Sequence, residues 1–285
     1  MIRKGDQLLS TLEQWEKYAE PKRAVQWQDY RSAKECARRW LERDDPARIP
    51  VELERILTAH PDFGVIREWE AEPEALVAFD EYDGPANIDV LVSARDDTGA
   101  FTMAIEAKAD ETFGPLVERA LSDALERRLE NPRSRGLARV EELAERLLGP
   151  VKKGQPRLHT IRYQLMTATA AALAEANRRG ASRAVVMVHE FDTPRTEPEK
   201  HKKNARDLVR YLKRLDVEDA ERVLEGELAG PIEVSGGTEI GRGVPLYVGK
   251  ATTPIAMRAR RSITTSSSGP TESIACPEPP TLTQP

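Results

Sequence analysis

The sequence contains few residues of the kinds that staple small secreted proteins or build zinc sites. It has two cysteines, Cys36 and Cys276, and only 5% of its residues are aromatic. Two cysteines so far apart do not imply a disulfide framework, and they fit a reducing compartment. None of the usual zinc-ligand spacings connects the four histidines, which are His60, His159, His189 and His201.

Long apolar runs are also missing. No segment approaches the roughly 20 apolar residues of a membrane helix, and the opening MIRKGDQLLSTLEQWEKY lacks the apolar run of a signal peptide. We therefore expect a soluble, cytoplasmic protein without a membrane partner. The formal net charge is -5, so any surface for nucleic acid would have to be local.

The length of 285 residues is enough for one large α/β domain or two small ones. We expect a helical N-terminal part over residues 1–60 that packs on an α/β core over residues 61–253. Residues 254–285 are rich in Ser, Thr and Pro, and we expect them to form a disordered tail.

Hydrophobic periodicity and turn residues predict the order of the elements. A helix is expected from an N-cap at Ser32, with Glu35 as its capping-box partner. Gly180 is expected to end a long alanine-rich helix. Other helices are expected at 51–60, in two pieces over 115–148, in the charged segment before residue 215, and near 217–228. Strands are expected at 65–79 (a hairpin or one bent strand), 88–94, 100–108, 183–191 and 244–252.

The strand FTMAIEAK carries charges at its end. Because strand side chains alternate between faces, Glu106 and Lys108 share one face with Thr102 and Ala104, opposite an apolar face. The short turn before this strand predicts an antiparallel hairpin, which would bring Asp89 beside Glu106. Ile88 and Val90 should then both point away from the Asp89 face.

Two carboxylates beside a lysine suit a hard divalent cation and an attacking water. Mg²⁺ prefers oxygen ligands, so Asp89, Glu106 and the backbone carbonyl of Ala107 are the candidate metal ligands. Lys108 would orient or deprotonate the water, or stabilise charge on phosphorus. The alternative is structural, since a Glu beside a Lys on a strand is often only a solvated pair.

This pattern resembles the PD-(D/E)xK phosphodiesterase superfamily, the fold of many restriction endonucleases and repair nucleases. Asp89 matches the motif's Asp, Glu106-Ala107-Lys108 matches the (D/E)xK, and Ile88 replaces the motif's proline. The segments SAKECARRW, IDVLV, IEAKADETFG, IRYQLMTATAAAL and AVVMVHEF, in that order, are similar to a group of uncharacterised bacterial proteins assigned to this superfamily. The resemblance implies a mixed central sheet flanked by helices, with an α-β-β-β-α-β core.

The resemblance also implies roles for other residues. Glu35 would bind a second metal or orient the metal ligands; the alternative is that it serves only as a capping residue. Gln164 would hold Lys108 or a phosphate oxygen, unless it is a buried amide bonded to backbone. Arg162 and Tyr163 would contact substrate phosphate, with a place in the core as the equal alternative for Tyr163. Glu111 is a weaker candidate for the site. The implied cofactor is Mg²⁺, with Mn²⁺ able to substitute.

A local excess of positive charge lies between the Glu-x-Lys strand and the glutamine helix. Residues 127–162 contain ten Lys or Arg and four Glu, which would give salt-sensitive nucleic-acid binding. Arginines on amphipathic helices are otherwise a solvated face. We therefore expect a Mg²⁺-dependent nuclease acting on DNA more than RNA, and a homodimer stays open. The alternatives are a catalytically silent binding or scaffold protein with the same fold, and a hydrolase of smaller phosphodiesters.

Overall fold

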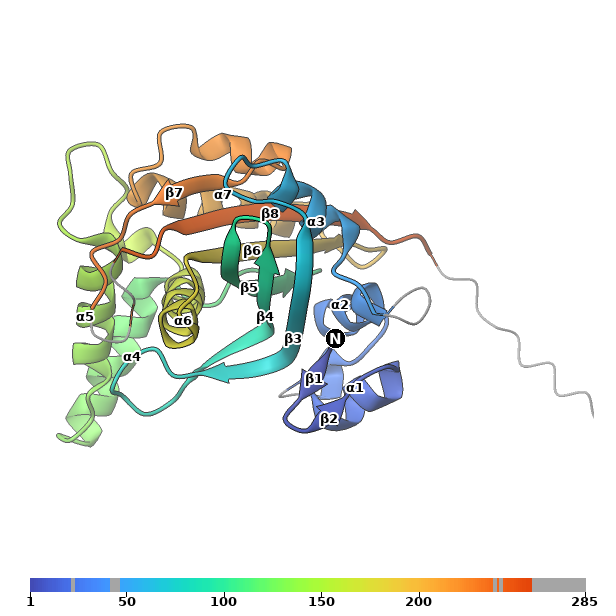
Figure 1. Ribbon diagram of the computed structural model, residues 1–285. Helices are drawn as coiled ribbons and strands as arrows, with labels where there is room; N and C mark the ends of the chain where they lie inside the picture. Colours follow the sequence, from blue (N-terminus) through green and yellow to red (C-terminus); the bar gives the residue numbers. More distant parts are fainter. Residues whose placement is uncertain (22–23, 42–46, 238–239, 241–242, 258–285) are drawn as a thin grey trace, which may run out of the picture.

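The computed structural model describes residues 1–21, 24–41, 47–237, 240 and 243–257. Figure 1 shows a twisted sheet with helices against both of its faces. The expected α/β class with a mixed central sheet flanked by helices is confirmed. The predicted disorder of the tail falls mostly on residues 258–285, outside the described residues.

The main sheet has six strands in the spatial order β3-β4-β5-β6-β8-β7. β5 runs parallel to β6, and β6 runs parallel to β8, whereas the other neighbours are antiparallel. A separate hairpin near the N-terminus consists of β1 and β2. The strands are β1 (Arg3–Lys4), β2 (Gln7–Leu8), β3 (Ile66–Val77), β4 (Ala86–Asp96), β5 (Gly99–Lys108), β6 (Arg183–Asp192), β7 (Ala229–Ile232) and β8 (Leu246–Pro254).

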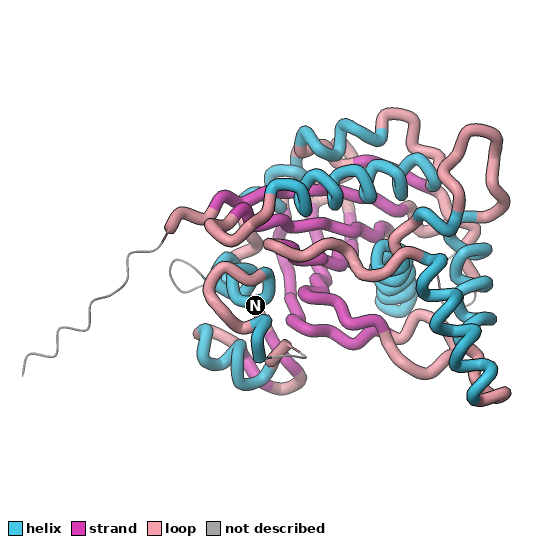
Figure 2. Tube along the Cα trace, turned by 180° about the vertical axis from the view of Figure 1, so that it is seen from behind, coloured by secondary structure: helices cyan, strands magenta, loops and turns pink. Residues whose placement is uncertain are grey.

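The helices divide between the two faces and one end of the sheet. α4 and α5 lie at the end of the molecule far from the N-terminal helices, as the two opposite views agree (Figures 1 and 2). The α-helices are α1 (Leu12–Tyr18), α2 (Ser32–Leu41), α3 (Val51–Thr58), α4 (Val117–Glu130), α5 (Gly136–Leu148), α6 (Tyr163–Arg179) and α7 (Pro198–Arg214). The 3₁₀ turns are η1 (Ala24–Gln26), η2 (Leu158–Thr160) and η3 (Ala220–Glu225).

Each face of the sheet has its own apolar core. On one face, Ala104 of β5 and Val186 of β6 pack with the buried alanines of α6. On the other face, Met103 and Ile105 of β5 pack with side chains of α2 and α3, such as Trp40. The strict alternation along β5 confirms that Thr102, Ala104, Glu106 and Lys108 face α6, and it places their strand between two helical layers.

The structure corrects several details of the predicted elements. α2 begins at Ser32, and the carbonyl of Arg31 accepts its first helical hydrogen bond, so the N-cap assignment to Ser32 is wrong by one residue. β3 is one bent strand rather than a hairpin. The segment near 217–228 forms the short η3, and the strands β1, β2 and β7 were not predicted. Gly180 ends α6 with φ 62° and ψ 31°, as expected for a left-handed C-cap.

Within the described residues, no helix combines the length and the apolar character needed to cross a membrane.

Candidate functional site at the end of strand β5

The β4–β5 hairpin brings Asp89 to the Glu-x-Lys segment. The paired register of β4 and β5 ends at Val90 and Ile105, the residues directly before Asp89 and Glu106 at this end of the hairpin, and the two carboxylates are close enough for the charge of Asp89 to raise the pKa of Glu106. Asp89 Oδ2 accepts a hydrogen bond of 2.7 Å from the backbone N–H of Ala107. The side chain of Asp89 therefore continues the hairpin and holds its carboxylate between Glu106 and Lys108.

The Lys108 side chain turns back along its own strand. Its Nζ lies 3.2 Å from Glu106 Oε2 and 3.1 Å from the carbonyl oxygen of Ala107. It also lies 5.6 Å from the centre of the Phe113 ring. Glu106 and Lys108 are only 1% and 4% exposed, so the pair is enclosed in the layer between β5 and α6.

Gln164 in the first turn of α6 fixes the Glu106 carboxylate. Its Nε2 donates to Glu106 Oε2 at 2.5 Å, and its Oε1 accepts the backbone N–H of Gly114 at 3.0 Å. The amide thus connects the acidic end of β5 to the segment that follows it. The expected contact of Gln164 with Lys108 is not among its hydrogen bonds, which run to the Gly114 N–H, as for the structural alternative, and to Glu106.

The electrostatics of the cluster reflect burial. Burial raises the pKa of Glu106 to about 8, with the negative charge of Asp89 adding to the rise and Lys108 opposing it. Burial also raises the pKa of Asp89, against Lys108 and the Ala107 N–H. Burial acts to lower the pKa of Lys108, but the charges of Glu106, Asp89 and Glu111 outweigh it and raise the pKa overall. Burial therefore favours the neutral forms of both carboxyl groups more than Lys108 favours their charged forms.

The donor set fits a cation only in part. Glu106 Oε2 receives both hydrogen bonds, from Lys108 and Gln164, so Glu106 Oε1 and Asp89 Oδ1 are the oxygens that face no donor among the described residues. The carbonyl of Ala107, the third predicted ligand, is occupied by the Lys108 ammonium. Within the part of the chain that the structure describes, no three His, Cys, Asp or Glu side chains form a ready metal site.

Glu74 of β3 is a further carboxylate near the cluster that the sequence did not reveal. It lies between two residues of β3 that pair with Val90 and Ile88, and its charge raises the pKa of Glu106. Its backbone has φ +48°, a conformation uncommon for a residue other than glycine. Asn87 Nδ2 donates to its Oε2 at 2.6 Å.

Strand alternation is interrupted around Asp89. Ile88 packs in the core on the α6 side, whereas Val90 packs in the core on the opposite side. The expectation that both point away from the Asp89 face is therefore wrong. Because the break lies beside the kink at Glu74, sequence periodicity alone could not position the two carboxylates.

Glu35 is buried on α2, in the layer opposite α6. Its Oε1 accepts the backbone N–H of Tyr30 at 2.8 Å and the Arg38 guanidinium at 2.7 Å. These contacts stabilise the start of α2, although not through the predicted capping box with Ser32.

Arg162 and Tyr163 point to different surroundings. Arg162 is buried, with Nε 2.6 Å from Asp207 Oδ2 and a guanidinium nitrogen 2.8 Å from the Gly114 carbonyl. These contacts tie α6 to α7 and occupy the side chain. Tyr163 is half-buried and lines a cavity beside α4 and α5.

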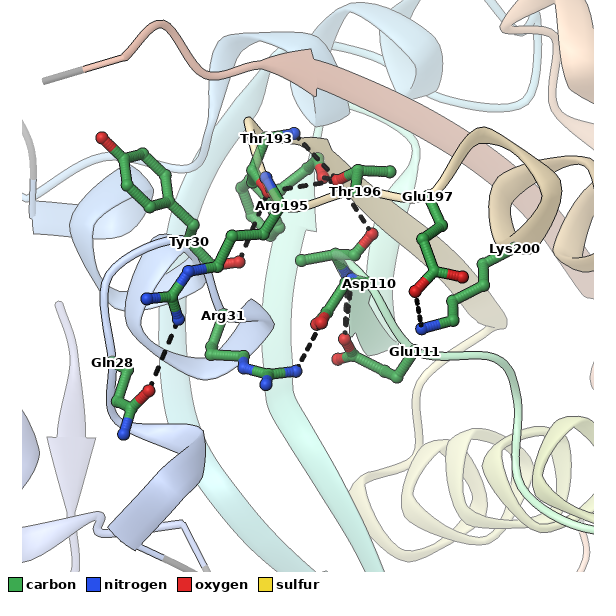
Figure 3. A network of polar contacts seen from close by, with 12 residues as sticks. Gln28, Tyr30, Arg31, Asp110, Glu111, Thr193, Arg195, Thr196, Glu197 and Lys200 are labelled. Atoms are coloured by element: carbon green, nitrogen blue, oxygen red, sulfur yellow. Dashed lines mark hydrogen bonds and ion pairs between the residues drawn. The ribbon is translucent and has the colours of Figure 1, made fainter.

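A polar network fixes the chain immediately after Lys108, as Figure 3 shows. Arg31 of the N-terminal part pairs with Asp110 at 2.5 Å, and Glu111 accepts the backbone N–H groups of Ala109 and Asp110. Thr196 donates to the Ala109 carbonyl. Glu111 therefore binds backbone beyond the strand, while its charge still acts on Lys108.

Comparisons with known proteins identify one related family. The model of a domain of unknown function, DUF6946, matches residues 8–255. No curated protein and no solved structure matches the chain.

Proposed function

Because the chain belongs to the DUF6946 family, a domain of unknown function, we propose a function from the site itself. The protein is a Mg²⁺-dependent phosphodiesterase with a restriction-endonuclease-like fold of the PD-(D/E)xK type. It hydrolyses nucleic acid, DNA in preference to RNA, and Mn²⁺ substitutes for Mg²⁺.

The observation that carries this proposal is the convergence of Asp89, Glu106 and Lys108. Asp89 comes from β4, and its carboxylate bonds the backbone of the residue between Glu106 and Lys108. With α3 set aside before β3, and α4, α5 and η2 set aside after β5, the remaining elements follow the order α2-β3-β4-β5-α6-β6, which is the order of the superfamily core and supports the finer assignment of the fold. Strongly shifted pKa values in one cluster are also typical of functional sites.

The carboxyl groups of the cluster support a divalent cation, because carboxylate oxygens are the ligands that Mg²⁺ prefers and a bound cation would favour their ionised forms against burial. Asp89 and Glu106 would hold it through Oδ1 and Oε1, which accept no hydrogen bond from a described residue. When bound, the metal would lower the pKa of water and neutralise charge on the reacting phosphate. Gln164 keeps the Glu106 carboxylate in place, and Lys108 presents an ammonium that can orient water or stabilise negative charge on phosphate oxygens.

One observation favours a second function, that of a nucleic-acid-binding or scaffold protein without catalysis. The Lys108 ammonium already satisfies Glu106 and the Ala107 carbonyl, and both side chains are almost completely buried. A buried, internally paired cluster can serve the fold alone. The Lys108 ammonium would have to leave the Ala107 carbonyl before a cation could bind that oxygen or a substrate could bind the ammonium.

Calorimetry with Mg²⁺ and Mn²⁺, followed by nicking of supercoiled plasmid, tests the proposal. The variants are Glu106→Gln, which keeps the shape of the side chain, and Glu175→Gln as a control that removes a buried carboxylate at the other end of α6. We expect Glu106→Gln to lose metal binding and nicking together, and Glu175→Gln to keep both. A folded wild-type protein that neither binds metal nor nicks DNA would refute the enzyme and favour the scaffold.

A further inference from the structure

A cavity lined by four arginines and three acids lies between α4, α5 and the first turn of α6. Its volume is about 660 Å³, within the range of ligand pockets. Arg127 of α4, Arg139 of α5 and two arginines of the connecting segment, Arg133 and Arg135, contribute to its lining together with Tyr163. The opposite wall comes from the loop that joins β3 to β4.

The arginines of this cavity differ in their partners. Arg139 Nε lies 2.7 Å from Asp80, and Arg135 pairs with Glu81 at 3.0 Å. Arg127 and Arg133 form no ion pair with any described carboxylate. Three acids also line the cavity, and two of them have partners, since Glu81 pairs with Arg135 and Asp123 pairs with Arg119 at 2.8 Å. Two guanidinium groups are thus left to bind an external anion, and Asp83 opposes them.

Tyr163 adds a neutral donor to the same cavity. Burial raises the pKa of its phenol, while the charges of Arg139 and Arg127 act to lower it. The phenol therefore stays protonated at neutral pH, close to two guanidinium groups. A hydroxyl donor beside guanidinium forks matches the oxygens of a phosphate group.

The cavity is connected to the carboxylate cluster by consecutive residues. Tyr163 lines the cavity, while Gln164, the next residue of α6, bonds Glu106. Likewise Pro115 lines the cavity, while the N–H of Gly114 bonds Gln164. A nucleic-acid strand bound in the cavity would therefore contact the residues that directly adjoin Gly114 and Gln164 in the chain.

We propose that this cavity binds the phosphate backbone of a nucleic-acid strand beside the bond to be cleaved. The inference rests on the proposed function and adds the surface that holds the substrate. Phosphate contacts position a nucleic acid without reading its sequence. The cavity is too small for a double helix, so the bound part is a short stretch of one strand.

The test is the binding of a fluorescein-labelled oligothymidylate, measured by anisotropy in EDTA so that cleavage plays no part. The test variant is Arg127→Ala with Arg133→Ala, and Arg127→Lys with Arg133→Lys keeps the charge. The control, Lys203→Ala with Arg206→Ala, removes two exposed cations from α7. Circular dichroism checks that each variant is folded.

We expect the alanine pair to weaken binding at least about tenfold, and the slope of log affinity against log salt to fall by about two between roughly 50 and 200 mM. The lysine pair should keep the slope, and the α7 control should bind as the wild type does. Unchanged binding by the alanine pair, or an equal loss in the α7 control, would overturn the inference.

Two further arms separate this inference from the proposed function. If dAMP binds as tightly as the oligonucleotide and depends on the same arginines, the cavity serves a small phosphate compound and the backbone inference is wrong. Oligonucleotide binding that survives the loss of both arginines, together with loss of metal binding and nicking in Glu106→Gln, would refute the cavity inference and leave the proposed phosphodiesterase function intact. A wild-type protein that binds no oligonucleotide overturns both the inference and the nucleic-acid substrate.

Discussion

Lys108 Nζ and Glu106 Oε2 lie 3.2 Å apart, two residues along one strand, with both side chains almost fully buried. Side chains two apart on a strand share a face, so such a pair forms easily at a surface. Burial makes the pair important for stability, because removing either residue would leave the charge of the other buried without a partner.

Replacing Lys108 with Met would leave the carboxylates of Glu106 and Asp89 without their ammonium. Removing one partner of a buried ion pair costs about 3–5 kcal/mol, and we expect a loss of that size in urea unfolding at neutral pH. The double variant Glu106→Gln/Lys108→Met should recover part of the loss, since less charge is left buried. Equal stability of the single and double variants would contradict this account of the pair.

Gln164→Ala should show whether Gln164 positions the Glu106 carboxylate for metal binding or only stabilises the fold. The variant removes the donor to Glu106 Oε2 and the acceptor of the Gly114 N–H. We expect nicking to fall about 10–100-fold, as when residues that orient metal ligands are lost, and stability to fall by about 1–3 kcal/mol. If the enzyme assignment is right, Mg²⁺ affinity should fall while the fold is retained. Lost stability with unchanged Mg²⁺ affinity and nicking would reduce Gln164 to a structural amide.

Glu35→Gln tests whether Glu35 takes part in metal binding. Its carboxylate bonds Tyr30 and Arg38, so we expect the loss of a charge-assisted bond to cost about 1–3 kcal/mol. Mg²⁺ affinity, measured by calorimetry, should stay as in the wild type. A clear drop in that affinity would show that Glu35 acts on the metal, as the family resemblance implies.

Asp96 should make the stability of the protein depend on pH in the acid range. Burial acts to raise the pKa of Asp96, but hydrogen bonds from Arg183, Gly64 and Thr98 outweigh it and hold the pKa well below its usual range. Because the folded pKa is lowered, this stabilisation is present above the unfolded pKa of about 3.9 and is lost as the pH falls below it.

Asp96→Asn should therefore be less stable than the wild type at neutral pH and should show a flatter loss of stability in acid. Urea unfolding from about pH 6 down to 2 measures both effects. The matched control is Asp97→Asn, the adjacent carboxylate that pairs with Arg67 at the surface. It should change stability little, and equal effects of the two variants would refute a special role for Asp96.

The sequence predicted those parts of the site that depend on a regular strand. Alternation along β5 placed Glu106 and Lys108 on one face, and the short turn at its start predicted the hairpin that brings in Asp89. The irregular positions were not predictable, because periodicity has no meaning at the kink formed by Glu74 or at the break between Ile88 and Val90. The ion pair between Arg162 and Asp207 could not be predicted either, since the two residues lie 45 positions apart in the chain.

The alanine-rich side of α6 has a consequence for the site. Buried small side chains, such as Ala168 and Ala172, let the helix approach β5 closely enough for Thr102 to donate to the Ala172 carbonyl at 2.9 Å. These methyl groups act as spacers that set the height of the helix above the sheet, and with it the reach of Gln164 to Glu106. A larger residue at Ala172 would lift the amide from the carboxylate without touching either one, so the precision of the site is maintained by residues with no chemistry of their own.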